Sequence, residues 1–447
     1  MRDIRPLLRL ALPIGCMLLG CNGPAASGGP VHEDPPATAA PLTVDQSLAL
    51  APVEGQSPVD LEIARLEKSL RGRAGDAVSW VQLGRAWVRK ARESTDPGFY
   101  LDADACARLA LGQQPGFVPA LDLRVLVMLN DHRFEDARAL AQKIVDAHPE
   151  DPMGYGSLSD ALLELGRYDE ASAAVQAMVD LKPNLASYSR ASYLAWLRGD
   201  ADAALESSRL AIDSGGDRKD PEPRAWQLVQ AATIFWQKGD YAGADAGFDL
   251  AMGKGMGDYP PALVGRARVA LARGDGPRAA ELLDRAYEHS PLVHTAWLLG
   301  DARAMAGDAD GAARAYAIVE KEGARTDRRT LSLYYATKNV EPARALALAE
   351  EERKVRGGIY TEDAYAWALH RNGREAEARA AIDRATALGT PDAMLLFHAG
   401  AIRIAQHDIA AGKKLIAKAL ALNPKFDVTG ADEARKLLGI AVDGGRT

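Results

Sequence analysis

The stretch Asp160–Ala171, with the sequence DALLELGRYDEA, decides the fold because it contains the whole turn between two amphipathic helices. Gly166 ends the first helix, since glycine tolerates the left-handed conformation of a helix C-terminal cap. Ala171 begins the inner face of the second helix, where a small side chain permits close approach of its partner. Pro183 ends that helix because proline lacks the backbone N–H that would continue it. Upstream of the turn, helical spacing predicts one buried stripe, formed by Tyr155, Leu158, Ser159 and Leu162.

The same turn returns along the chain as a residue, usually glycine, that is followed five places later by a small side chain. The glycine is present in the copies at Gly166, Gly199, Gly239, Gly274, Gly307 and Gly373. Three further copies have His132, Lys338 and His407 in its place. Successive copies from His132 onward lie 31 to 40 residues apart. A fixed period of about 34 residues is typical of a solenoid of stacked helix pairs.

These residues resemble the tetratricopeptide repeat family. The first unit carries the family pattern in four residues, Trp80, Leu83, Gly84 and Trp87. The resemblance implies an all-α fold, a right-handed superhelical solenoid of about ten helix pairs over residues 76–425. We expect an N-terminal capping helix in residues 58–75 and a C-terminal capping helix and tail in 426–447, because a terminal repeat must cover its open apolar face.

The composition agrees with an elongated array. The chain has 447 residues, which is too long for one compact core, and its 47% hydrophobic content excludes wholesale disorder. Three cysteines exclude a disulfide scaffold. The net charge of −7 gives no support to a nucleic-acid partner, which needs a basic surface for the phosphates.

The N-terminus has the pattern of an export signal. Three arginines at positions 2, 5 and 9 precede an apolar run, Leu10 to Leu19, that is too short to span a bilayer. The run ends in Leu-Leu-Gly-Cys, which resembles the lipobox of bacterial lipoproteins. The resemblance implies that residues 1–20 are a signal peptide and that Cys21 carries acyl chains such as palmitate. Cys16 fits less well because Pro13 stands where the aliphatic residue belongs. The alternative is an ordinary signal peptide with a chance cysteine.

Residues 21–57 have the composition of a tether. Residues 22–58 hold seven prolines, Pro58 included, among many alanines, glycines and serines and without apolar periodicity. In the lipoprotein family, aspartate after the acylated cysteine is associated with retention at the inner membrane. This chain has Asn22 there, so we expect a cell-envelope protein, anchored in the outer membrane and facing the periplasm.

Motifs with catalytic or metal-binding spacing are missing from the sequence. The eight histidines include no His-Glu-x-x-His pair, and no Gly-x-Ser-x-Gly elbow is present. Cys106 lies in an apolar helix pattern without a recognisable histidine partner. We predict no catalytic residue, no metal site and no cofactor, and therefore no enzyme.

The most informative pattern is a second stripe on the first helix of each unit. In the family these helices line a concave groove that commonly binds extended peptides. Positions 13, 10, 6 and 3 before the turn lie on one side of the helix. In the middle units this stripe is rich in rings: Tyr193, Trp196, Trp226, Trp236, His294, Trp297, Tyr335, Tyr360, Trp367 and His370.

Two interpretations of this stripe stay open. The rings either pack against the first helix of the next unit or form an aromatic groove for a ligand. Tryptophan and tyrosine offer large contact areas at low cost in rotamer entropy and are frequent in binding hot spots. The sequence therefore predicts a non-enzymatic scaffold that binds a partner polypeptide in its concave face. The alternative is a glycan- or solute-binding lipoprotein that uses the aromatic groove.

Overall fold

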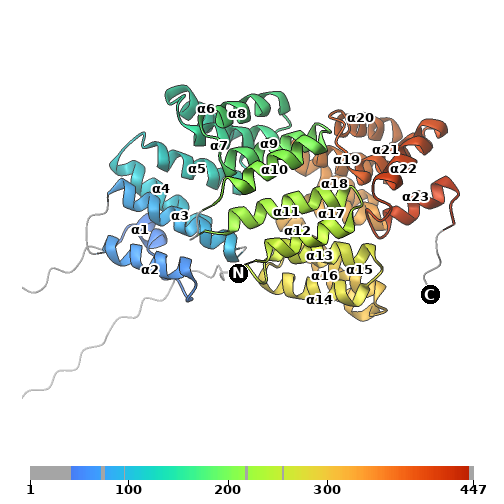
Figure 1. Cartoon of the computed structure of the whole chain (residues 1–447), viewed down its shortest axis with the longest axis horizontal. Coiled ribbons are helices and arrows are strands. Elements are labelled where there is room, and N and C mark those ends of the chain that lie inside the picture. Colours follow the sequence, from blue (N-terminus) through green and yellow to red (C-terminus); the bar gives the residue numbers. More distant parts are fainter. Residues whose placement is uncertain (1–41, 72–75, 95, 217–219, 254–255, 442–447) are drawn as a thin grey trace, which may run out of the picture.

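The computed structural model describes residues 42–71, 76–94, 96–216, 220–253 and 256–441. Over this part of the chain it contains 23 helices and no strand. Ten consecutive helix pairs form the body, and the predicted all-α solenoid is thereby confirmed. The pairs follow one another along the array in Figure 1.

The two helices of each pair are antiparallel neighbours that pack on each other and on the next pair. The first five pairs are α3 Ala77–Ser94 with α4 Phe99–Gln113, α5 Val118–Asn130 with α6 Phe134–Ala147, α7 Pro152–Glu164 with α8 Tyr168–Leu181, α9 Leu185–Leu197 with α10 Ala201–Asp213, and α11 Glu222–Gln237 with α12 Tyr241–Ala251. The last five are α13 Pro260–Ala272 with α14 Gly276–His289, α15 Val293–Met305 with α16 Ala309–Thr326, α17 Arg328–Lys338 with α18 Pro342–Arg353, α19 Ile359–Arg371 with α20 Glu375–Ala385, and α21 Ala393–Ala405 with α22 Ile409–Leu422.

The turns of the last nine pairs have the predicted left-handed residue. The six turn glycines have φ values between +70° and +87°. His132 and His407 adopt φ values of +58° and +66° at the same place. In the eighth pair the left-handed residue is Asn339, at +53°, and not Lys338 as the spacing predicted. Asparagine tolerates this conformation better than lysine, because its short polar side chain bonds locally.

The N-terminal cap is larger than predicted. Helix α2, Pro58–Arg71, lies where a capping helix was expected, but a further helix, α1 Val44–Ala49, precedes it and packs on α4. The indole N–H of Trp87 donates to the backbone oxygen of Ala49 at 3.0 Å, and Arg108 pairs with Asp45 at 2.8 Å. The prediction of a tether over residues 21–57 is therefore wrong for its last part, which is folded. Residues 21–41 lie outside the described residues.

At the C-terminal end of the array, α23 Gly430–Leu438 packs on α21 and α22.

The solenoid turns far enough to touch itself, and we call this line of contacts the seam. In Figure 1 the middle pairs, α7 to α12, lie beside the last pairs, α19 to α22. Three turns meet three loops in order. The amide of Gly357 donates to the oxygen of Glu164 at 2.8 Å, the Thr390 hydroxyl donates to the oxygen of Leu197 at 2.5 Å, and the Asn423 amide donates to the oxygen of Trp236 at 2.8 Å.

The seam is tightest where α7 and α8 meet the loop before α19. A Cβ atom on Gly166 would lie 2.3 Å from the oxygen of Gly357, so only glycine fits there. The amide of Ile359 donates to the hydroxyl of Tyr168 at 2.7 Å. Arg356 pairs with Glu164 at 2.7 Å. These contacts hold together residues that are nearly 200 positions apart.

We predict that Gly357→Ala opens this part of the seam. The new Cβ would lie 2.6 Å from the backbone oxygen of Leu165, which cannot move aside as a flexible side chain would. Hydrogen exchange at the Ile359 amide should accelerate, and the radius of gyration measured by small-angle X-ray scattering should increase. Gly112→Ala is the matched control, because a Cβ there meets nothing within 4 Å. Equal exchange rates in both variants would contradict the prediction.

Candidate functional site

The structure divides the ten predicted stripe residues by burial. Five side chains are buried: Trp196, Trp236, Trp297, Tyr335 and Trp367. Three are partly buried, namely His294, Tyr360 and His370. The remaining two are exposed, Tyr193 by 40% and Trp226 by 47%. A role in partner binding stays a prediction for all ten, but only the two exposed rings have a large surface open to a partner.

Three members of the stripe pack within the C-terminal half of the solenoid. Trp367 is 1% exposed and stacks on the buried ring of His398 with the centroids 4.1 Å apart. His370 also stacks on Trp367 and makes 3.0 Å contacts with Glu375. Tyr335 is buried in the same apolar cluster. These three residues therefore fit the interpretation that the rings pack inside the protein.

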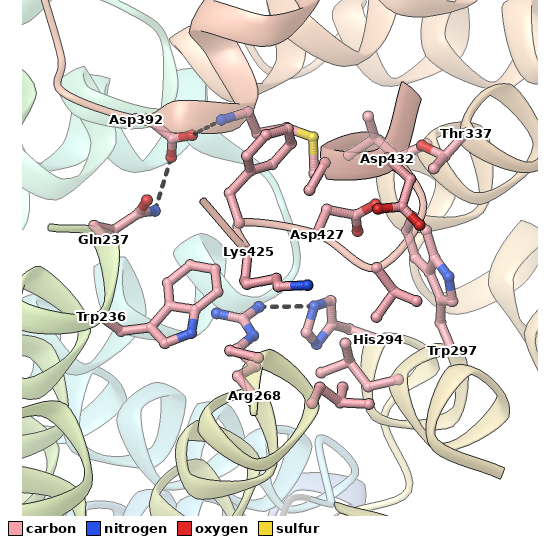
Figure 2. A pocket seen from close by; sticks show the side chains of 18 of the residues that line it. Trp236, Gln237, Arg268, His294, Trp297, Thr337, Asp392, Lys425, Asp427 and Asp432 are labelled. Atoms are coloured by element: carbon pink, nitrogen blue, oxygen red, sulfur yellow. Dashed lines mark hydrogen bonds between the residues drawn. The ribbon is translucent and has the colours of Figure 1, made fainter. Parts of the chain in front are cut away.

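Four other members come together around one cavity of about 460 Å³, which we call the inner cavity. Trp236, His294, Trp297 and Tyr360 line it from α11, α15 and α19. The lining is completed by α13, by α17, by the start of α21, by the 425–428 loop and by α23. Figure 2 shows the labelled side chains around this space. Rings from separate units, far apart in sequence, thus line one cavity.

Arg268 is the central residue of the inner cavity that sequence reasoning missed. Arg268 lies six places before Gly274 and therefore occupies a position of the stripe. The sequence pattern places it correctly, but only aromatic and histidine rings were considered as stripe members. Its Nη2 donates to Nε2 of His294 at 2.9 Å, and its guanidinium lies 5.3 Å from the ring centre of Trp236. Figure 2 shows the guanidinium between these two rings. No carboxylate among the described residues lies within 4 Å of it.

Burial determines the protonation of this pair. It lowers the pKa of the Arg268 guanidinium, and the more distant Asp392 and Asp427 oppose that effect. Burial, with the positive charges of Arg268 and Arg329, lowers the pKa of His294 to about 3. The imidazole is therefore neutral at ordinary pH, and its Nε2 accepts the arginine's hydrogen bond.

The acidic side chains of the lining are occupied by their own surroundings. Asp392 accepts from the Gln237 amide at 2.9 Å and from the backbone amide of Met394 at 2.9 Å. Burial raises the pKa of the Asp392 carboxyl. Asp427 accepts backbone amides from residues 429 and 430, two and three places further on. These carboxylates cap their loops and do not neutralise Arg268.

Among the same described residues, no group of three histidine, cysteine or acidic side chains is placed to hold a metal ion. No helix in this part of the chain combines the length and the apolar character needed to cross a membrane. Cys21, the predicted lipidation site, lies outside the described residues. Cys106 is buried, and burial raises the pKa of its thiol.

Comparison with known proteins identifies the repeats. The tetratricopeptide repeat family model matches residues 129–186 and 264–325. These two segments are similar to tetratricopeptide repeats. Cellulose synthase operon protein C of Pseudomonas fluorescens (strain SBW25) is 27% identical over 181 residues, which cover 38% of this chain and 13% of that protein.

Solved structures with similar folds have low sequence identity. The human IFIT1 dimer with m7Gppp-AAAA is 11% identical with a TM-score of 0.45, and the match covers 85% of this chain and 94% of that one. PilW, described as a widely conserved type IV pilus biogenesis factor, is 14% identical with a TM-score of 0.37, over 47% of this chain and 94% of that one.

We predict a pH dependence of stability from His294. An unfolded histidine takes up a proton near its usual pKa of 6.5, whereas the folded His294 does so only at about 3. The folded state therefore loses stability as the pH falls from about 6.5 towards 3, by up to about 1.4 kcal/mol per pH unit. His294→Gln keeps an acceptor for Arg268 without titrating, so its stability should fall less steeply. Urea denaturation at several pH values measures the difference.

The control for this experiment is His148→Gln, which removes an imidazole side chain that is 42% exposed. Its stability should follow that of the unaltered protein between neutral and acidic pH. If the His294→Gln curve also runs parallel to the unaltered protein, the imidazole is not held neutral by the cavity.

Proposed function

We propose that this protein is a non-enzymatic scaffold of the bacterial cell envelope that binds a partner polypeptide on the concave side of its repeats. Tetratricopeptide repeats generally mediate protein–protein interactions. The observation that carries the proposal is the exposure of two large rings on the first helices of neighbouring units, Tyr193 on α9 and Trp226 on α11. Exposed tyrosine and tryptophan are the side chains most often responsible for binding energy.

The surroundings of Tyr193 favour an enclosed contact for the partner. Burial raises the pKa of the Tyr193 phenol, with Glu164 adding to the effect, although 40% of its surface is open. The raised pKa and the exposed surface are both explained if the ring faces a hollow inside the solenoid. Arg329 and Arg356 lie near enough to oppose the pKa shift. A partner segment that contacts Tyr193 would meet a ring with two arginines nearby.

Membrane anchoring through Cys21 is part of the same proposal. The lipobox resemblance supports it. Two or three acyl chains hold a protein at a bilayer stably, because each buried methylene contributes about 0.8 kcal/mol.

A second candidate function is the binding of a glycan or another solute. The observation that favours it is the inner cavity, where Trp236 and Trp297 stand beside polar groups. Ligand sites are commonly concave, mostly apolar and supplied with a few convergent polar groups. The name of the Pseudomonas relative refers to a cellulose synthase operon, which is consistent with a glycan ligand.

Site-specific photo-crosslinking in the envelope tests the scaffold. A benzophenone amino acid at position 193 or 226 should crosslink the same partner polypeptide, because both side chains would face it. The same probe at Leu250, which is 67% exposed on α12, is the matched control and should not. Exposed positions are better than Trp236 or Trp297, whose truncation would also open a cavity in the fold. Identical adducts at all three positions, or none at 193 and 226, would overturn the proposal.

Metabolic labelling with palmitate tests the anchor. We expect Cys21→Ser to abolish the label, because the acylated thiol is gone, and Cys16→Ser to keep it. Persistent labelling of the Cys21→Ser variant would refute the lipobox interpretation.

A further inference from the structure

The charge of Arg268 has no counter-charge in direct contact. A guanidinium has five N–H donors in a planar fork that matches a carboxylate. One of these donors is used on the neutral ring of His294. An enclosed charge without a paired opposite charge is costly, so it is rarely found without a purpose.

Arg190 on α9 shows what a paired arginine looks like in the same solenoid. It makes two hydrogen bonds to Asp160 on α7, from Nε at 2.9 Å and from Nη2 at 2.6 Å. Asp160 outweighs the effect of burial and raises the pKa of the Arg190 guanidinium. At Arg268 the pKa is lowered, because Asp392 and Asp427 are too far away to offset burial. Arg268 thus lacks the partner that Arg190 has.

The position of Arg268 is fixed by its two neighbours. His294 accepts from Nη2, and the ring of Trp236 lies under the guanidinium at 5.3 Å. Figure 2 shows this group among the cavity-lining side chains, reached from α13. The donor fork is therefore preorganised towards a space of about 460 Å³, and preorganisation lowers the entropy cost of binding.

We propose that the inner cavity binds a small organic carboxylate, with Arg268 pairing with its charge and Trp236 and Trp297 contacting its flat apolar part. The proposal rests on the second candidate function, solute binding, and specifies the chemical class of the solute. A ligand carboxylate would supply the missing counter-charge. The apolar body would lie among the rings and aliphatic side chains of the lining, which include Phe426 and Leu333.

The acidic side chains of the cavity are engaged elsewhere and do not pair with Arg268. Asp363 contacts His398 at 2.8 Å, and Asp392 and Asp427 cap their own loops. Lys425 also lines the cavity, so Arg268 is not the only cation that a ligand carboxylate would meet there.

Isothermal titration calorimetry on the full chain tests the proposal with phenylacetate as the probe. Phenylacetate should bind, and its neutral analogue phenylacetamide should bind at least about tenfold more weakly, because it lacks the charge that pairs with Arg268. These comparisons use the unaltered protein, so they do not depend on the folding of any variant.

The variant arm uses two arginines of one helix. Arg268→Gln should weaken phenylacetate binding at least about tenfold. Arg266→Gln removes the same charge two residues away, where Arg266 pairs with Asp245 and Asp249, and should leave the affinity unchanged. A circular dichroism spectrum and a melting curve establish that both variants are folded.

Three outcomes would overturn the proposal: no heat of binding with phenylacetate up to about 10 mM, equal affinity for the acid and the amide, or equal affinity of Arg268→Gln and Arg266→Gln. Cellobiose, titrated in parallel, separates this failure from that of the second candidate function. Binding of cellobiose or of the amide without preference for the acid would keep a solute site and refute the charge pairing.

Discussion

The left-handed residue at the turn of each of the last nine helix pairs is the constraint on which the rest of the structure depends. It reverses the chain within a few residues, and so it sets the angle at which the second helix meets the first. Glycine does this without a steric penalty. At Gly166, Gly199 and Gly239 the missing side chain has a second effect, because the backbone oxygens of Gly357, Gly389 and Leu422 approach within the space that a Cβ would fill.

The seam that these glycines permit explains where the candidate sites lie. An open solenoid would present its stripe to a partner as a continuous groove. Here the last pairs occupy part of that concave space, so Trp367 and Tyr335 pack in the interior while Trp236 and Trp297 border the inner cavity. Only Tyr193 and Trp226 keep large exposed faces. The stripe is thus divided into buried rings, rings that line the cavity and two exposed rings.

The parts that could be predicted from sequence are those governed by local chemistry. The turn, the period and the stripe register depend on residues a few positions apart, and so the helix pairs and four cavity residues were found. Helix α1 was missed because six residues show no periodicity. The seam was missed because Gly357 and Glu164 carry no local sign of their contact. Arg268 was overlooked because the stripe was searched for rings, although its register was correct.

The order of contacts along the seam also restricts how this chain can change in length. The turn of the third pair meets the loop before the ninth, the turn of the fourth meets the loop before the tenth, and the turn of the fifth meets the loop before α23. Repeat arrays with only nearest-neighbour contacts tolerate gain or loss of whole units. Here one extra helix pair between the fifth and the ninth pair would displace all three contacts together. The number of repeats between them is thereby fixed by geometry, as in a ring and unlike an open spiral.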